Sequence, residues 1–202
     1  MAVSDMKARA RSVLDPVAQF AADVGVSPAG LTVTGLILSG LAGFSLARGS
    51  FPAAAVFLVL SGVCDMLDGA VARLTDGSSD EGAFLDSTAD RYSEAFVLLG
   101  ALHYYLFRSG GAPEEATAIA VFLAFWGSLL VSYTRARAEG VGRECSVGIA
   151  ERPERVVLMI VGALLGPAVL RVVLWVLVGL THVTAVQRIV HVLYPGGRRY
   201  RP

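Results

Sequence analysis

Two pairs of aspartates stand out in the stretch from residue 65 to residue 90. Asp65 and Asp68 are three positions apart, and Asp86 and Asp90 are four positions apart. On a helix, these spacings place the two members of each pair on one face. The polar segment between the pairs lets two helices turn back on each other. We therefore expect four carboxylates to converge on one volume.

Converging carboxylates repel one another unless a cation lies between them. Mg²⁺ prefers oxygen ligands and is commonly held by a few carboxylates together with substrate phosphates. Two such ions can stabilise both the attacking and the leaving oxygen of a phosphoryl transfer. The pattern therefore predicts a site for two Mg²⁺ ions, with Mn²⁺ as a substitute. The predicted ligands are Asp65, Asp68, Asp86 and Asp90.

Small residues accompany the aspartates on the same helical faces. Gly69 and Ala72 extend the face of the first pair, and Gly82 stands one helical turn before the second pair. Residues with almost no side chain leave room for a ligand against the helix backbone. Arg73 comes directly after Ala72 in the sequence, and its guanidinium can pair with a phosphate. The stretch therefore predicts a site for a phosphate-bearing substrate between two helices.

The combined pattern resembles the signature of the CDP-alcohol phosphotransferase family. That signature is Asp, two residues, Asp-Gly, two residues, Ala-Arg, eight residues, Gly, three residues, Asp, three residues, Asp. The resemblance implies transfer of a phosphatidyl group from CDP-diacylglycerol to an alcohol, with release of CMP, by a homodimer. It also implies that the last aspartate, Asp90, is the general base. All eight fixed positions are present: Asp65, Asp68, Gly69, Ala72, Arg73, Gly82, Asp86 and Asp90.

Two other interpretations of the aspartates stay open at this point. They could belong to a polar loop that faces water, although loop acids have no need of helical spacing. They could also form the ion path of a cation transporter, although such a path does not require the small residues and Arg73 at their positions. Metal-dependent release of CMP from CDP-diacylglycerol distinguishes the enzyme from both.

The resemblance extends to the loop that leads into the first predicted membrane helix. In the family this loop and nearby backbone approach the nucleotide. Ala29 stands where relatives often have Asn or Asp, which is a departure from the pattern. The implied nucleotide-binding residues are Ala29, Gly30, Leu31, Thr32, Gly69, Ala72, Arg73, Ser79 and Gly82.

A second group of basic residues lies further along the chain. Ser132-Tyr-Thr-Arg-Ala-Arg-Ala-Glu, Glu151-Arg-Pro-Glu-Arg and a late Gln187-Arg188 resemble the phosphatidylinositol-phosphate synthase branch of the family. That branch implies inositol phosphate as the acceptor, with its phosphate held by Arg135, Arg155 and Arg188. Position 135 is Arg where relatives often have Lys, which preserves the charge and alters the reach.

The identity of the acceptor remains open on the residues alone. Basic residues also gather at cytoplasmic helix ends for reasons of topology. The alternatives with the same chemistry are glycerol 3-phosphate, free inositol and serine. We expect the lipid bilayer as a further partner and no nucleic acid.

Composition indicates an all-α integral membrane protein. Hydrophobic residues make up 54% of the chain, and the mean hydropathy is +0.61. Periodicity predicts an amphipathic surface helix over residues 4–25. The sequence as a whole reads as one domain, 1–202, in which 1–30 precede a six-helix bundle (31–193) and 194–202 form a basic tail. The six predicted transmembrane helices cover residues 31–47, 52–74, 82–107, 113–138, 153–165 and 168–193.

The basic residues are distributed unequally between the two ends of the predicted helices. Arg48, Arg108 and Arg171 lie at one end, and the other fourteen Lys and Arg residues lie at the opposite end. The positive-inside rule makes the second end cytoplasmic. We therefore expect a multi-pass protein of the plasma membrane whose active site faces the cytoplasm. Cys64 and Cys145 are not expected to form a disulfide.

Overall fold

The chain is all-helical in the computed structural model, which describes residues 15–75, 79–110 and 114–194. Residues 15–23 are helical, in agreement with the predicted surface helix, whose earlier part lies outside the described residues, as does the basic tail from 195 onward. The remaining helices are α2 (Pro28–Ala47), α3 (Phe51–Leu74), α4 (Asp80–Phe107), α5 (Glu115–Glu139), α6 (Arg152–Leu165) and α7 (Pro167–Leu193).

The helix boundaries follow local chemistry. Ser27 caps α2, because its hydroxyl accepts from the Gly30 N–H at 3.1 Å, and α2 begins at Pro28 rather than at residue 31. Ser79 caps α4 in the same way through Gly82 at 3.0 Å, so α4 begins two residues earlier than predicted. The other bounds agree within two residues.

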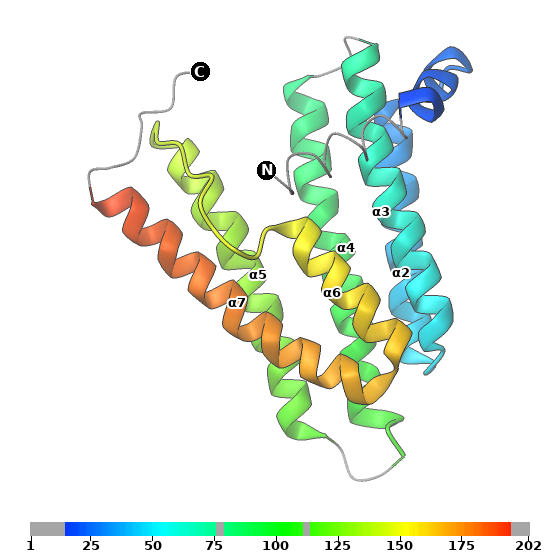
Figure 1. The fold of residues 1–202 in the computed structure, drawn as a ribbon, viewed down its shortest axis with the longest axis vertical. Coiled ribbons are helices and arrows are strands. Elements are labelled where there is room, and N and C mark those ends of the chain that lie inside the picture. The colour runs from blue at the N-terminus through cyan, green and yellow to red at the C-terminus, as the bar shows by residue number, and fades with distance from the viewer. Residues whose placement is uncertain (1–14, 76–78, 111–113, 195–202) are drawn as a thin grey trace.

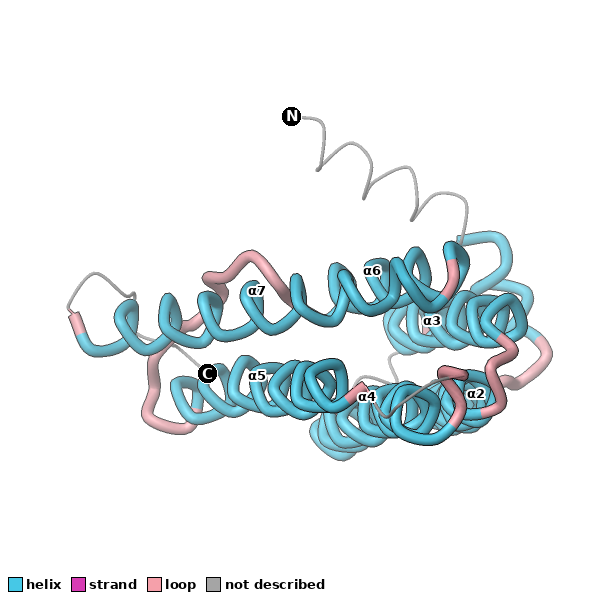
Figure 2. Tube along the Cα trace, turned by 90° about the horizontal axis from the view of Figure 1, so that it is seen from below, coloured by secondary structure: helices cyan, strands magenta, loops and turns pink. Residues whose placement is uncertain are grey.

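The helices pack as a closed ring. The main packing partners run from α2 to α3, α6, α7, α5, α4 and back to α2. Figure 1 shows this arrangement from the side, and in Figure 2, seen from below, α3, α6 and α7 face α2, α4 and α5. Buried apolar residues from all six helices form one core cluster. A ring of this kind encloses a space at its centre that side chains of several helices share.

Small residues bring α2 and α4 unusually close. A Cβ on Gly43 would overlap the Phe96 carbonyl, and a Cβ on Gly100 would overlap the backbone of Gly43. Where α2 meets α3, the hydroxyls of Ser39 and Ser61 are 2.8 Å apart in the core, and Ser61 donates to a backbone carbonyl of α2. Close backbone approach and buried hydroxyl pairs are the usual means of helix association in membranes.

Among the described residues, four helices are long and apolar enough to cross a membrane: α2, α3, α5 and α7. The six-span prediction is confirmed for these four by length and composition. Helix α4 carries five charged residues in its first half: Asp80, Glu81, Asp86, Asp90 and Arg91. Helix α6 has 14 residues, or about 21 Å, against a hydrocarbon core of about 30 Å. Whether α4 and α6 cross completely stays a prediction.

The short length of α6 has a clear structural cause. The segment from 140 to 151 turns back along α5 and α7 into the molecule, so that α6 begins partway down the bundle (yellow in Figure 1). This segment is fixed to α7, where the Thr184 hydroxyl accepts from the Ala150 N–H at 3.1 Å and Arg188 donates to the Val147 carbonyl at 2.8 Å. The first residue of α6, Arg152, consequently lies inside the ring.

We predict that Gly100→Ala destabilises the protein, because the added methyl group meets backbone that cannot move aside. Overpacking of this kind typically costs about 1–3 kcal/mol. Gly179→Ala on α7 is the matched control, since a Cβ there meets nothing within 4 Å. Thermal unfolding in detergent measures both. Equal melting temperatures for the two variants would contradict the close packing of α2 on α4.

Candidate active site

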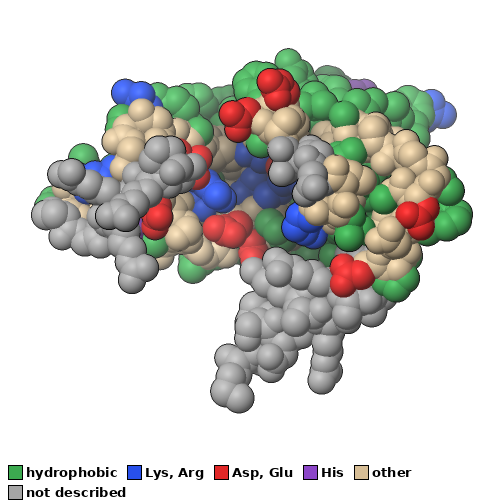
Figure 3. All heavy atoms as spheres, turned by 90° about the horizontal axis from the view of Figure 1, so that it is seen from above, with side chains coloured by type: hydrophobic (Ala, Val, Ile, Leu, Met, Phe, Trp, Pro, Cys, Tyr) green, Lys and Arg blue, Asp and Glu red, His purple; other side chains and the backbone are tan. Residues whose placement is uncertain are grey.

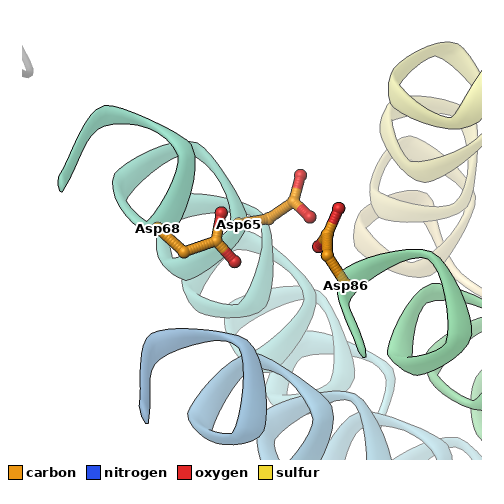
Figure 4. A group of neighbouring side chains, drawn as sticks. All are labelled: Asp65, Asp68 and Asp86. Atoms are coloured by element: carbon orange, nitrogen blue, oxygen red, sulfur yellow. The ribbon is translucent and has the colours of Figure 1, made fainter. Parts of the chain in front are cut away.

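Three of the four signature aspartates lie together where α3 faces α4. One ligand oxygen from each of Asp65, Asp68 and Asp86 lies within 4.8 Å of the others. Figure 4 shows these three side chains sharing the space between the two helices. The helical spacing predicted from the sequence thus brings carboxylates of both pairs to one volume.

Asp68 is the most buried of the three and is held by α2. The Thr32 hydroxyl lies 3.0 Å from its Oδ2 atom and 3.1 Å from the Pro28 carbonyl, so one proton is shared between two acceptors. This contact places the first turn of α2, which the sequence assigned to nucleotide binding, directly against the carboxylates. A hydrogen bond to a charged group is worth about 1.5–3 kcal/mol when well buried.

Asp90 lies one helical turn beyond Asp86 and has cationic partners. Arg152 Nη2 is 2.8 Å from Asp90 Oδ1, and Arg91 Nη2 is 3.3 Å from Asp90 Oδ2. Arg152 also donates to Asp65 through Nη1. Arg152 therefore connects α6 to both α3 and α4. Within the described part of the chain, Asp68 and Asp86 have no cationic partner within 4.0 Å.

Sequence reasoning did not assign Arg152 to the site. Its neighbour Arg155 was selected from the same Glu-Arg-Pro-Glu-Arg segment because of the family resemblance. The available signal was positional: Arg152 is the first residue of a helix that follows a polar segment, at the same end of the bundle as the aspartates. The contact itself depends on the inward path of residues 140–151, which the sequence pattern does not reveal.

Three connected spaces surround Arg152. The carboxylate cleft is lined by the four aspartates and Thr32. An apolar cavity of about 320 Å³ lies beside it, between α3, α4 and α6, and includes Asp65 in its wall. The arginine cavity, of about 1080 Å³, lies on the other side among α4, α5, α6 and α7, and includes Asp86 and Asp90. Figure 3 shows acidic and basic side chains gathered around a hollow at this end of the molecule.

The three predicted acceptor-binding arginines line the arginine cavity and differ in their burial and in their bonding partners. Arg155 is 2% exposed, pairs with Glu94 through two nitrogens at 2.7 and 3.2 Å, and donates to the Ala150 carbonyl at 3.0 Å. Arg188 is equally buried and bonds the carbonyls of Val147 and Val131. The side chain of Arg135 is 53% exposed, and among the described residues its one ion pair is with Glu139 on its own helix. Of these three arginines, two are buried and bonded to protein groups and one is accessible.

The predicted nucleotide-binding residues all lie at one end of α2, α3 and α4. Ala29, Gly30 and Leu31 are in the first turn of α2, and Ser79 and Gly82 form the cap of α4. The other members, Gly69, Ala72 and Arg73, are in the last turns of α3. Of this set, Thr32 alone lines the carboxylate cleft. The structure therefore gathers the predicted set around the cleft, and its role in binding remains a prediction.

Both cysteines of the chain lie among the described residues. Cys64 and Cys145 are both free, so the expectation of no disulfide is confirmed. Cys145 lies in the segment between α5 and α6, where burial raises the pKa of its thiol. A thiol of raised pKa is a poor nucleophile at neutral pH.

Comparison with characterised sequences gives consistent matches along most of the chain. The profile of the CDP-alcohol phosphatidyltransferase family matches residues 26–186. The chain is 38% identical over 186 residues to archaetidylinositol phosphate synthase of Methanothermobacter thermautotrophicus, covering 90% of this chain and 89% of that protein. It is 36% identical over 186 residues to phosphatidylinositol phosphate synthase of Corynebacterium glutamicum, covering 90% and 84%.

The fold also matches solved structures. The crystal structure of Mycobacterium tuberculosis phosphatidylinositol phosphate synthase with CDP-DAG bound superposes with a TM-score of 0.83 at 32% identity, covering 92% of this chain and 96% of that one. The same enzyme in complex with manganese and citrate gives 0.81 at 33% identity, with 90% of each chain covered. The chain therefore belongs to the CDP-alcohol phosphatidyltransferase family and is a transferase similar to its inositol phosphate synthases.

Proposed function

We propose that this chain transfers a phosphatidyl group from CDP-diacylglycerol to inositol phosphate and releases CMP. The observation that carries the proposal is the order of the three spaces: the carboxylate cleft lies between an apolar cavity and a cavity rich in arginine. A lipid-linked diphosphate and a soluble phosphorylated alcohol can then approach the same carboxylates from opposite sides. Membership of the family removes the cation-transporter alternative.

The donor side fits a lipid. The apolar cavity is lined mainly by aliphatic side chains of α3 and α6 and reaches Asp65, which also borders the cleft. A hydrocarbon chain placed there keeps its diphosphate beside the aspartates. The exposed first turn of α2 and the cap of α4 are close enough to bind the cytidine end. A related enzyme has been solved with CDP-DAG bound, which supports this class of donor.

The carboxylates fit divalent cations. Four acidic groups share the cleft, two of them without a cationic partner among the described residues, and all offer oxygen ligands. Asp65, Asp68, Asp86 and Asp90 would hold two Mg²⁺ ions, or Mn²⁺ in their place, as a related structure with manganese supports. Bound there, such ions would neutralise the diphosphate and the departing CMP.

The chemical step breaks one P–O bond and forms another. The acceptor hydroxyl attacks the phosphorus that carries the lipid, the bond to the bridging oxygen breaks, and CMP leaves with that oxygen. The hydroxyl proton passes to a carboxylate oxygen of Asp90. Asp90 and Asp86 are the two aspartates that line both the cleft and the arginine cavity, so they can meet an acceptor that arrives from that side.

The acceptor side fits a phosphate. Arg135 is accessible, and its i, i+4 partner Glu139 is a weak competitor in an exposed position. Arg91 Nε, in the wall of the same cavity, is the one buried side-chain nitrogen or oxygen of the described residues that has no hydrogen-bond partner. A phosphate oxygen in the cavity could accept a hydrogen bond from Arg135. In that case the main role of Arg155 and Arg188 would be to hold the shape of the cavity, because their nitrogens already bond protein groups.

Other acceptors and other lipids remain alternatives to be tested. Glycerol 3-phosphate also carries a phosphate, whereas free inositol and serine do not. Relatives are named for archaetidyl as well as phosphatidyl products. The proposal therefore does not specify the lipid chains of the donor. A panel that combines CDP-diacylglycerol with each acceptor, and measures CMP release with magnesium or with chelator, distinguishes them. The predicted homodimer is part of the proposal, and light scattering of the purified protein tests it.

We predict that Asn at any of positions 65, 68, 86 and 90 lowers the rate of CMP release at least about a hundredfold, because each carboxylate supplies a metal ligand or the base. Chelation of divalent cations should abolish the reaction of the wild type. Asp23→Asn, at an exposed position that is not among the residues lining the cleft, is the control and should retain full activity. Activity near the wild-type level in two of the four variants would contradict the proposed reaction.

We predict that Arg135→Ala raises the KM for inositol phosphate about tenfold or more, because a charge-assisted hydrogen bond is lost. The KM for CDP-diacylglycerol should hardly change, since the donor lies on the other side of the cleft. Arg137→Ala, on the same helix, is the matched control. An equal rise in both KM values, or rapid turnover of free inositol, would argue against a phosphorylated acceptor.

We predict that Arg155→Met lowers the free energy of unfolding by about 3 kcal/mol, because it leaves the Glu94 carboxylate unpaired and largely buried. The double variant with Glu94→Met should recover most of the loss, since no charge remains uncompensated. Chemical denaturation in detergent measures both. If the double variant loses as much stability as the two single variants, Arg155→Met and Glu94→Met, lose together, Arg155 is not a structural partner of Glu94.

The chain is a multi-pass membrane protein, and we propose that the carboxylate end faces the cytoplasm. In a background without Cys64 and Cys145, a cysteine at exposed Glu144 should be protected from an impermeant thiol reagent in intact cells. A cysteine at exposed Arg108, at the opposite end of the bundle, should react. The reverse labelling pattern would invert the topology.

A further inference from the structure

Arg152 stands where the donor side, the cleft and the acceptor side meet. Of the described residues it is the one that lines the apolar cavity, the carboxylate cleft and the arginine cavity together. Its guanidinium donates to Asp65 on α3 and lies 2.8 Å from Asp90 on α4. A single side chain from α6 thus joins the two halves of the aspartate signature.

The two carboxylates that Arg152 engages belong to the proposed metal set. An oxygen lone pair that accepts from a guanidinium cannot also bind a cation, and the guanidinium charge repels a cation placed nearby. Asp68 and Asp86 remain without such a partner among the described residues. Arg152 therefore occupies one oxygen of Asp65 and one oxygen of Asp90 and disfavours a cation beside them, so that it competes with metal for these two carboxylates.

The side chain of Arg152 has space into which it can withdraw. It is 21% exposed, and cavities of about 320 and 1080 Å³ adjoin it on either side. Its backbone is fixed, because it opens α6 and Pro153 follows at once. Rotation about its long side chain is therefore sufficient to free both carboxylates without moving a helix.

We propose that Arg152 is a positioning residue that takes the place of the missing cationic charge in the metal-free enzyme and competes with divalent cations for Asp65 and Asp90. While it is bound, it stabilises the closely spaced carboxylates; when it withdraws, both become free to bind metal. Arg152 thereby sets the metal concentration at which the site fills. This inference rests on the metal site of the proposed function.

The test measures Mn²⁺ binding directly, from the electron paramagnetic resonance signal of free Mn²⁺ over purified protein, without substrate. We expect Arg152→Gln to bind Mn²⁺ about tenfold more tightly than the wild type, because the competing hydrogen bonds are gone. The same variant should melt at a lower temperature when metal is absent. Arg137→Gln removes an equal charge from an exposed position near the same end and should leave the affinity unchanged.

Two further measurements separate competition from a general structural role. Arg152→Lys keeps the charge but cannot bridge both carboxylates, so its Mn²⁺ affinity should lie between those of the wild type and Arg152→Gln; this variant carries the test if Arg152→Gln does not fold. Added guanidinium ion should weaken Mn²⁺ binding by Arg152→Gln more than by the wild type, and tetramethylammonium should not.

The outcomes also separate this inference from the proposed metal site. Asp86→Asn should abolish Mn²⁺ binding in the wild-type background if the cleft is the metal site. If the wild type binds Mn²⁺ in an Asp86-dependent manner and neither Arg152 variant binds more tightly, the competition is wrong and the metal site stands. If no protein binds Mn²⁺, or Asp86→Asn has no effect on binding, both fail.

Discussion

Mutual repulsion among carboxylates within a helical bundle is the constraint on which the rest of the structure depends. Four acidic side chains share one cleft between α3 and α4, and intramembrane acids are unfavourable unless they are compensated. Part of the compensation is internal, through Arg152, Arg91 and the Thr32 hydroxyl. The rest of the negative charge can be balanced by a bound cation. A binding site for cations is thus the consequence of an electrostatic balance that the chain leaves incomplete.

The helices are shaped to support that balance. Helix α2 packs against α3, where the hydroxyls of Ser39 and Ser61 lie 2.8 Å apart, and in the same interface Thr32 reaches Asp68 of α3. On the other side of the ring, the segment 140–151 is fixed to α7 and turns inward, so that α6 delivers its first side chain to the centre. Because α6 is short, it begins inside the bundle, and the guanidinium of its first residue, Arg152, reaches the aspartates.

The sequence predicted the features that depend on local spacing. The register of Asp65, Asp68 and Asp86 followed from helical periodicity. The sequence did not predict contacts between distant segments. Arg152 reaches Asp65 only because residues 140–151 fold back, and no local pattern encodes that path. The same holds for the pairing of Arg155 with Glu94, which periodicity alone does not indicate.

The arginine cavity shows how pairing can divide similar residues into different roles. Arg155 and Arg188 use their nitrogens on carbonyls and carboxylates of the surrounding backbone and helices, so replacing those bonds by bonds to a ligand would leave buried groups unsatisfied. Arg135 can exchange Glu139 for a phosphate at little loss, because its present pair is exposed to water. A neutral alcohol offers no such exchange. If the acceptor carries a phosphate, Arg135 is therefore the arginine of this group that can distinguish it from a neutral alcohol.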